Sequence, residues 1–168
     1  MSKNRTWTKL TTFHIHHNNI GVERAVALSE NTFWTNLTDL SLGRNKIGDE
    51  GIAALSTNNA WTNLQILNLA LNSIRDEGAT SLANNTSWTS LTSLSLAMNS
   101  IGVIGACALS KNTSWRKLTI LTLTGNKIGS EGAEALRNNN SWRNLTQLSL
   151  EMRGLSGKGT TVSGKNVS

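Results

Sequence analysis

Tryptophan recurs at a fixed interval along most of this 168-residue chain. Each tryptophan lies 27 residues after the previous one, at Trp7, Trp34, Trp61, Trp88, Trp115 and Trp142. A fixed period of roughly 20–50 residues is typical of solenoids, whose units bury their apolar faces only against neighbouring units. The period therefore predicts a stack of similar units, and the length of the chain suits one domain.

Each unit combines a strand pattern with a helix pattern. In the second unit, Leu40 and Leu42 alternate with polar or small residues, as in a strand with one buried face. Asp49 and Glu50 then begin a predicted short helix, where carboxylates interact favourably with the helix dipole. Asn58 is interpreted as the end of that helix, because asparagine tolerates a left-handed conformation. The period predicts strands near residues 12–15, 39–42, 66–69, 93–96, 120–123 and 147–150, with about five short helices outside them.

Equivalent positions of successive units form columns of one residue type. The asparagine column is interpreted as structural, because a buried Asn side chain can satisfy backbone groups where the chain leaves the strand. The tryptophans fall in register with the apolar columns, so we interpret them as core residues whose indole N–H needs one partner. Glycines in the helices are expected to let each helix approach the strand layer closely. The asparagines are Asn18, Asn45, Asn72, Asn99 and Asn126, and the glycines are Gly51, Gly78, Gly105 and Gly132.

The repeated pattern also matches a known kind of repeat. Leu-x-x-Leu-x-Leu-x-x-Asn-x-Ile, followed by Gly-x-Glu-Gly-Ala-x-x-Leu, resembles leucine-rich repeats of the ribonuclease-inhibitor type, from residue 7 to about residue 153. The resemblance implies an α/β solenoid, a horseshoe with parallel strands on its concave face and short helices on its convex face. It also implies that the concave face binds other proteins. The chain departs from the subtype in its slightly short unit and in carrying Trp where Leu is more usual.

The ends of the chain are less regular than its middle. Arg153 replaces the asparagine in the sixth unit, and no helical period follows it. We therefore expect a solenoid over residues 1–155, with five full repeats and a partial sixth. Residues 156–168 are expected to form a flexible basic tail rich in Gly, Ser and Thr.

The outward-facing strand positions predict a contact surface. They carry small, mostly uncharged side chains, and three apolar residues, Leu71, Met98 and Met152, lie at one rim. Exposed apolar residues in a line are typical of such a surface. We therefore predict a non-catalytic protein–protein interaction module, monomeric, that binds a protein partner through its concave face. The residues predicted to contact the partner are Asp39, Ile66, Asn68, Leu71, Ser95, Met98, Ile120 and Thr122.

The basic C-terminal third suggests an alternative. The formal net charge is +6, and residues 111–168 hold nine Lys and Arg against three Glu. Arg116, Lys117 and Arg143 lie near the last two tryptophans and would form a basic edge that binds anions, either nucleic acid or an acidic surface. Nucleic acid is not expected, because no aromatic residue alternates with these charges.

A histidine cluster in the first unit is a second candidate site. His14 and His16 would share the outer face of one strand, with His17 beside them and Asp39 on the next strand. Such a group could bind a metal ion or respond to pH. Because it occupies a single strand of a terminal unit, we favour solvated surface histidines and predict no metal.

Catalysis, cofactors and membrane insertion are not predicted. The chain has no Cys–His spacing or metal-ligand signature, and most of its carboxylates lie at predicted helix starts. Cys107 is the only cysteine, which excludes a disulfide within the chain and favours a reducing compartment. No segment reaches the ~20 apolar residues of a membrane helix, and the N-terminus lacks an apolar signal region. The sequence thus predicts a cytoplasmic protein.

Overall fold

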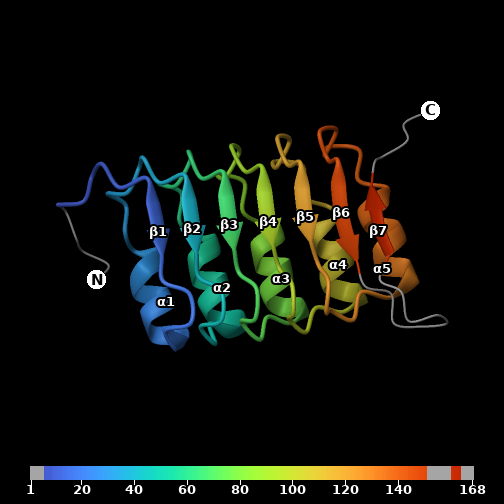
Figure 1. Ribbon diagram of the computed structural model, residues 1–168, viewed down its shortest axis with the longest axis horizontal. Coiled ribbons are helices and arrows are strands. Elements are labelled where there is room, and N and C mark those ends of the chain that lie inside the picture. The colour runs from blue at the N-terminus through green and yellow to red at the C-terminus, as the bar shows by residue number, and fades with distance from the viewer. Residues whose placement is uncertain (1–5, 151–159, 164–168) are drawn as a thin grey trace.

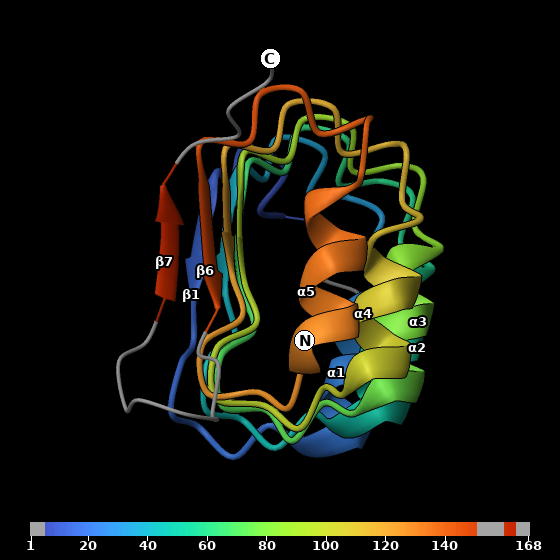
Figure 2. The ribbon, with the colours of Figure 1, turned by 90° about the vertical axis from the view of Figure 1, so that its right-hand side faces the viewer.

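A computed structural model describes residues 6–150 and 160–163 of the protein. Within these residues, strands and helices alternate along the chain and form two layers, a row of strands and a row of helices (Figures 1 and 2). The strands are β1 (Thr12–His14), β2 (Asp39–Ser41), β3 (Ile66–Asn68), β4 (Ser93–Ser95), β5 (Ile120–Thr122), β6 (Gln147–Leu150) and β7 (Thr160–Ser163). The helices are α1 (Gly21–Ser29), α2 (Gly48–Ser56), α3 (Asp76–Ala83), α4 (Val103–Leu109) and α5 (Gly129–Arg137).

The sheet repeats with the period of the sequence. Strands β1 to β6 are parallel and lie in chain order, and each residue pairs with the residue 27 positions further on, such as Leu40 with Leu67. Each strand begins at the predicted residue, and the first five are one residue shorter than predicted. The α/β solenoid predicted from the sequence is confirmed.

The core fills the space between the two layers. Trp34, Trp61, Trp88, Trp115 and Trp142 are fully buried, together with the leucines of the strand columns. The prediction is wrong for Trp7, whose surface is 51% exposed. Its ring stacks on Trp34, with centroids 6.4 Å apart, but no unit in the described part of the chain covers its other side.

The buried indole groups are not all hydrogen-bonded. Trp88 donates its indole N–H to the carbonyl of Asn58 at 3.1 Å. The indole nitrogens of Trp34, Trp61, Trp115 and Trp142 have no such partner among the described residues. An unsatisfied donor costs about 1–3 kcal/mol. Burying ~200 Å² of a tryptophan contributes about 5 kcal/mol, so the ring still stabilises the core without its hydrogen bond.

The asparagine column is structural, as predicted. Asn45 shows its role: the side-chain oxygen accepts the backbone N–H of Asn18 at 2.9 Å in the preceding unit. Its amide nitrogen donates to the carbonyls of Ile15 at 2.9 Å and Leu42 at 3.0 Å. One side chain therefore satisfies backbone groups of two consecutive units at the point where the chain leaves the sheet.

A second asparagine column, not predicted from the sequence, follows the helices. Helix α2 ends at Ser56, Thr57 after it keeps a right-handed backbone, and Asn58 is not left-handed either, so the left-handed role expected of Asn58 is wrong. Asn58 is instead buried, where it accepts the N–H of Trp61 at 3.3 Å and donates to the carbonyl of Asn31 at 2.9 Å. This column fixes the loops that lead back into the strands. Its buried members are Asn31, Asn58, Asn85, Asn112 and Asn139.

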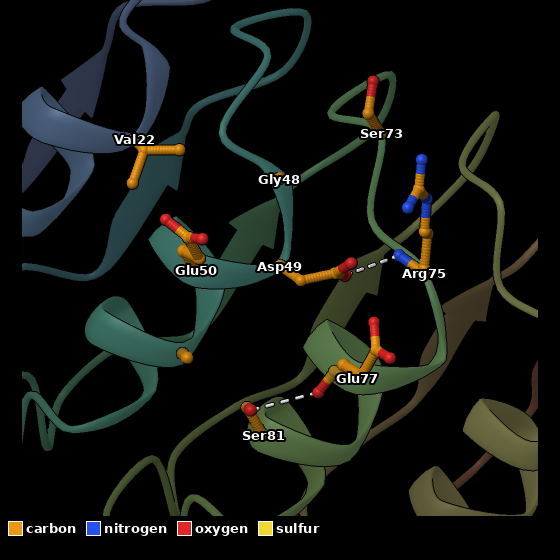
Figure 3. A pocket seen from close by; sticks show the side chains of 9 residues that line it. Val22, Gly48, Asp49, Glu50, Ser73, Arg75, Glu77 and Ser81 are labelled. Atoms are coloured by element: carbon orange, nitrogen blue, oxygen red, sulfur yellow. Dashed lines mark hydrogen bonds between the residues drawn. The ribbon is translucent and has the colours of Figure 1, made fainter.

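Two helices are capped by an aspartate of the preceding unit. Asp49 accepts the backbone N–H groups of Arg75 at 2.7 Å and Gly78 at 3.0 Å, at the start of α3 (Figure 3). Asp76 caps α4 in the same way through Gly102 and Gly105. These side chains satisfy N–H groups that have no partner within the helix.

Where the preceding unit has no aspartate at that position, the helix begins differently. Gly48 starts α2 with a left-handed backbone, φ +66°, and donates its N–H to the carbonyl of Asn72 at 2.9 Å. Arg75, at the equivalent position of α3, is extended. Glycine permits the left-handed start, and the aspartate cap makes the extended one possible.

The helix glycines give room both to the buried isoleucine of their own unit and to the helix of the preceding unit. A Cβ at Gly78 would lie 2.5 Å from the capping carboxylate of Asp49, and one at Gly105 would lie 2.7 Å from that of Asp76. Adjacent helices therefore pack closely because these positions have no side chain.

The last strand breaks the repeat. Strand β7 pairs antiparallel with β6 (Figures 1 and 2). In this pairing Leu148 lies opposite Val162. This strand is not predicted from the sequence and falls within the stretch expected to be a flexible tail, residues 156–168. The other residues of that stretch, and Met152 and Arg153 before it, lie outside the described residues. Among the described helices, none has both the length and the apolar character required to span a bilayer.

Candidate functional site

The predicted contact residues come together on the sheet side of the molecule. Each parallel pairing places equivalent residues side by side, so Asp39, Ile66 and Ile120 lie in one row. Asn68, Ser95 and Thr122 lie in a second row. These two rows, with the remaining outward strand residues of β1 to β6, are called the strand face below. It lies opposite the helix layer (Figure 2).

Two of the predicted residues lie at the edge of this face instead of on the strands. Leu71 and Met98 occupy the turns that follow β3 and β4. Because the strands are parallel, the turns that leave them all lie at one edge of the sheet. We call this row of turn residues the exit rim; it consists of His17, Arg44, Leu71, Met98 and Gly125.

The exit rim has a left-handed backbone throughout. Leu71 has a φ of 58° and Met98 a φ of 54°, in a column where Gly125 has 74°. For residues with a Cβ this conformation costs roughly 1–2 kcal/mol each. Leu71 and Met98 are nevertheless 45% and 57% exposed, so they gain little from burial. The fold itself does not account for apolar side chains at these two positions.

Gly125 makes room for the side chain of Met98. A Cβ added to Gly125 would lie 2.4 Å from Met98 Sδ, so the thioether lies over the glycine. Ile66, at the opposite end of the strands from this pair, is 43% exposed on the strand face. The exposed apolar side chains therefore form two groups, Leu71 and Met98 at the exit rim and Ile66 at the start of β3, with the small polar residues of the second row between them.

The histidine cluster is only partly assembled. His14 Nε2 lies 3.0 Å from Asp39 Oδ1, an ion pair when the histidine is protonated. His16 and His17 are exposed in the turn after β1. No group of three or more His, Cys, Asp or Glu side chains in the described part of the chain is arranged to hold a metal ion.

The basic edge lies at the opposite edge of the sheet from the exit rim, where the chain enters the strands. Arg116 and Lys117 precede β5, and Arg143 precedes β6, so all three lie in loops that enter strands. All three are exposed. The guanidinium Nε of Arg116 donates to the carbonyl of Thr113 at 3.3 Å. The basic edge and the exit rim are therefore separate surfaces.

The helix side of the described chain is hollowed between neighbouring helices. One hollow, of about 630 Å³, lies between α2 and α3 and is lined by Asp49, Glu50, Arg75 and Glu77, among others (Figure 3). Its central carboxylate, Asp49, is already occupied in capping α3. The hydroxyl of Ser81 donates to the backbone carbonyl of Glu77 at 3.0 Å, so it too is occupied. These contacts serve to begin helix α3. The residues that line this hollow do not place a nucleophile beside a base, so they form no catalytic arrangement of that kind.

Comparison with known proteins agrees with this architecture. The family model described as Leucine Rich repeat matches residues 35–56, 62–83, 89–110 and 116–136, which together make up just over half of the chain. The chain belongs to the leucine-rich repeat family. Each match begins directly after one of the tryptophans Trp34, Trp61, Trp88 and Trp115. The boundaries of the family unit and the tryptophan period therefore coincide.

This leucine-rich repeat chain also resembles a solved structure. The similar structure is described as "Leiomodin-1 Actin-Binding Site 2 (ABS2)", with a TM-score of 0.53 and 20% sequence identity. The similarity covers 90% of this chain and 75% of the other. At that identity the match supports the fold alone. No curated protein sequence matches the chain significantly.

Proposed function

We propose that this leucine-rich repeat protein is a non-catalytic interaction module that binds a protein partner through the strand face and the exit rim. The carrying observation is the set of exposed apolar side chains Ile66, Leu71 and Met98, two of which adopt a costly backbone conformation. Backbone strain concentrates at functional sites, where the surrounding structure holds it in place. The solenoid of residues 1–155 would supply the scaffold, and Asp39, Asn68, Ser95, Ile120 and Thr122 the surrounding contacts.

The scaffold suits this role because it is rigid. Each second-row residue of β3 to β5, such as Asn68, lies between two buried leucines, and each first-row residue, such as Ile66, precedes one. Pairing with the neighbouring strands fixes both rows further. A surface that is ordered before binding loses less conformational entropy when the partner arrives. The alternation of one short strand with one helix also supports a ribonuclease-inhibitor-like subtype. The actin-binding site in the name of the similar structure agrees with a protein partner, although the match does not identify one.

Paired charge variants test which surface binds. The wild-type protein is immobilised, partners are captured from an extract of its own cells, and binding of the captured protein is then measured with purified components. Ile66→Arg with Ile120→Arg should abolish binding while leaving the fold intact, since both side chains reach the surface of the strand face. Arg116→Glu with Arg143→Glu is the matched control on the basic edge, and it should leave binding largely unchanged.

The opposite result would favour the anion-binding alternative. Arg116, Lys117 and Arg143 are exposed, and Arg116 and Arg143 lie one unit apart in equivalent loops, so they could meet two phosphates or an acidic surface. Binding by the basic edge would weaken steeply with salt, because counterions are released on association. Binding by the largely uncharged strand face would change little between low and physiological salt.

A further inference from the structure

One helix differs from the others on its solvent side. Four helices carry a glutamate at the same outward position, Glu23, Glu50, Glu77 and Glu131. In α4 this position is Ile104, which is 71% exposed, more than any other exposed large hydrophobic residue in the described part of the chain. Helix α4, Val103–Leu109, contains no charged residue at all. A single exposed isoleucine is common on protein surfaces. Here, however, the isoleucine takes the place of the glutamate that the other four helices carry, and this occurs only in the unit of α4.

The isoleucine lies beside a hollow of similar character. Between α3 and α4 the surface forms a depression of about 520 Å³, lined by Ile104, Val103, Cys107 and Ala108. Thr80 and Ala83 of α3 also line it. A projecting apolar side chain and a recess of small apolar residues therefore occur on one surface. We call this surface the α4 patch.

Most charges around the α4 patch are divided between its two ends; the exception is exposed Glu134, which lies midway along α5 between Glu131 and Arg137. Glu77 and Glu131 flank Ile104 in the neighbouring units, at the N-terminal ends of α3 and α5. Lys111 follows the C-terminal end of α4, and Arg137 is the last residue of α5. All four side chains are exposed. One end of the patch is acidic and the other is basic.

We propose that the α4 patch binds a second copy of this chain, with the two α4 helices antiparallel. A two-fold axis in the interface, running across the helices, places the acidic end of each patch against the basic end of the other. Helix α5 then faces its own copy, so Glu131 of one copy lies opposite Arg137 of the other. Ile104 of each copy enters the recess of the other. A parallel arrangement would instead place acidic ends together, at an electrostatic cost.

This dimer leaves the proposed partner surface free. The helices and the strand face lie on opposite sides of the molecule (Figure 2). Stable interfaces bury roughly 800 Å² per partner, which is more than one short helix can supply. Helices α3 and α5 must therefore also contact the second copy, and their charged residues beside the α4 patch would lie in that contact. The inference does not depend on the function of the strand face, and it departs from the monomer expected from the sequence.

Sedimentation equilibrium of the full chain over a range of concentrations tests the dimer. The wild-type mass should rise towards two copies as concentration increases, because association follows mass action. Ile104→Glu should remain monomeric and folded, since it installs the residue that the other four units carry. The matched control is Val26→Glu, which adds the same charge to α1, far from the patch, and should dimerise like the wild type. A wild-type protein that stays monomeric throughout, or an Ile104→Glu variant that dimerises normally, overturns the proposal.

A charge exchange tests the antiparallel arrangement. Glu131→Arg places two arginines opposite each other, and Arg137→Glu places two glutamates there, so each single variant should dimerise at least several-fold more weakly. Combining both substitutions restores opposite charges and should recover the wild-type dissociation constant. If the double variant loses as much dimerisation free energy as the two single variants together, the antiparallel pairing is contradicted.

Cys107 offers an independent readout. It is the only cysteine in the sequence and lies partly exposed in the α4 patch. A short bis-maleimide should therefore join two wild-type copies and yield a dimer band under denaturing conditions. The yield should fall to background in Ile104→Glu, whose thiol reacts equally with a monofunctional maleimide. Equal cross-linking in both proteins would show random collisions and count against the interface.

Discussion

At the scale of single residues, the structure separates positions that serve the fold from positions that do not. The buried Asn45 satisfies backbone groups of two units, and removing it would leave them without partners. Leu71 shows the reverse: its left-handed backbone destabilises the fold, and nearly half of its surface is exposed. Residues of the second kind are those expected to act on something outside the chain.

Leu71→Gly should therefore stabilise the protein and weaken partner binding. Glycine adopts the left-handed conformation without a steric penalty, and its larger entropy in the unfolded state offsets only part of the gain. We expect the free energy of unfolding in urea to rise by about 0.5–1 kcal/mol. Ser73→Gly, at φ 59° in the same loop, is the control: it should gain similar stability and leave binding unchanged. A Leu71→Gly variant that binds normally would remove Leu71 from the site.

The sequence predicts the residues that serve the fold better than those expected to contact a partner. The columns of Leu40 and Leu67 are visible because burial imposes one residue type on every unit. The asparagine column ending at Asn139 was present in the sequence too, but it was hidden among other Asn-rich loop residues. The left-handed backbone of Met98 is harder to predict from the sequence than the buried columns. Only Gly125, at the equivalent position of the next unit, indicates a left-handed turn there.

At the scale of elements, the start of a helix depends on the unit before it. The extended start of α3 is held by Asp49, whose carboxylate accepts two backbone N–H groups. The start of α2 depends on the left-handed Gly48 instead. Asp49 and Glu50 lie in the first turn of α2, as predicted. Asp49 has a second role that was not predicted, because its carboxylate caps the next helix, α3.

Asp49→Ala should destabilise the protein by about 1 kcal/mol, since loss of an N-cap leaves the N–H groups of Arg75 and Gly78 unsatisfied. The neighbouring Glu50→Ala removes the same charge from an exposed side chain and should change the free energy of unfolding by no more than about 0.5 kcal/mol. Urea denaturation of both variants provides the comparison. Equal losses would mean that charge at the helix start matters and that the hydrogen bonds of Asp49 do not.

Strand β7 marks the limit of what the repeat pattern can predict. Every other strand follows from the period, because the inward leucines recur every 27 residues. Thr160–Ser163 belongs to no column, and its pairing with β6 is antiparallel. Exposed edge strands attract any extended segment with free backbone groups, and such pairing depends on the backbone more than on side chains. A search for repeats therefore cannot find it.

At the scale of the whole molecule, stability should be shared between neighbouring units. Trp61 and Trp88 stack with ring centroids 6.3 Å apart, and Trp115 stacks on Trp142 at 6.3 Å. Each helix also packs against the next along the row. In such a stack a unit in the middle is supported from both sides, and a terminal unit from one.

Trp88→Ala should therefore be more damaging than Trp142→Ala, although both side chains are fully buried. Removing a buried tryptophan from the middle should cost about 3–5 kcal/mol. The same change near the end should cost clearly less, because the last unit can fray while the others remain folded. Urea midpoints measured by circular dichroism provide the comparison. Equal shifts would show that the solenoid unfolds as one block.

The aspartate caps also limit how units of this kind can be rearranged. A unit whose helix begins with Arg75 folds properly only behind a unit that supplies an aspartate, as Asp49 does. Behind a unit with Val22 or Val103 at that position, it would have neither a cap nor a glycine. A tandem copy of the third unit carries its own Asp76 and satisfies the rule. Recombination of these repeats, in evolution or in the laboratory, is thus constrained at each junction by a residue that belongs to the neighbour.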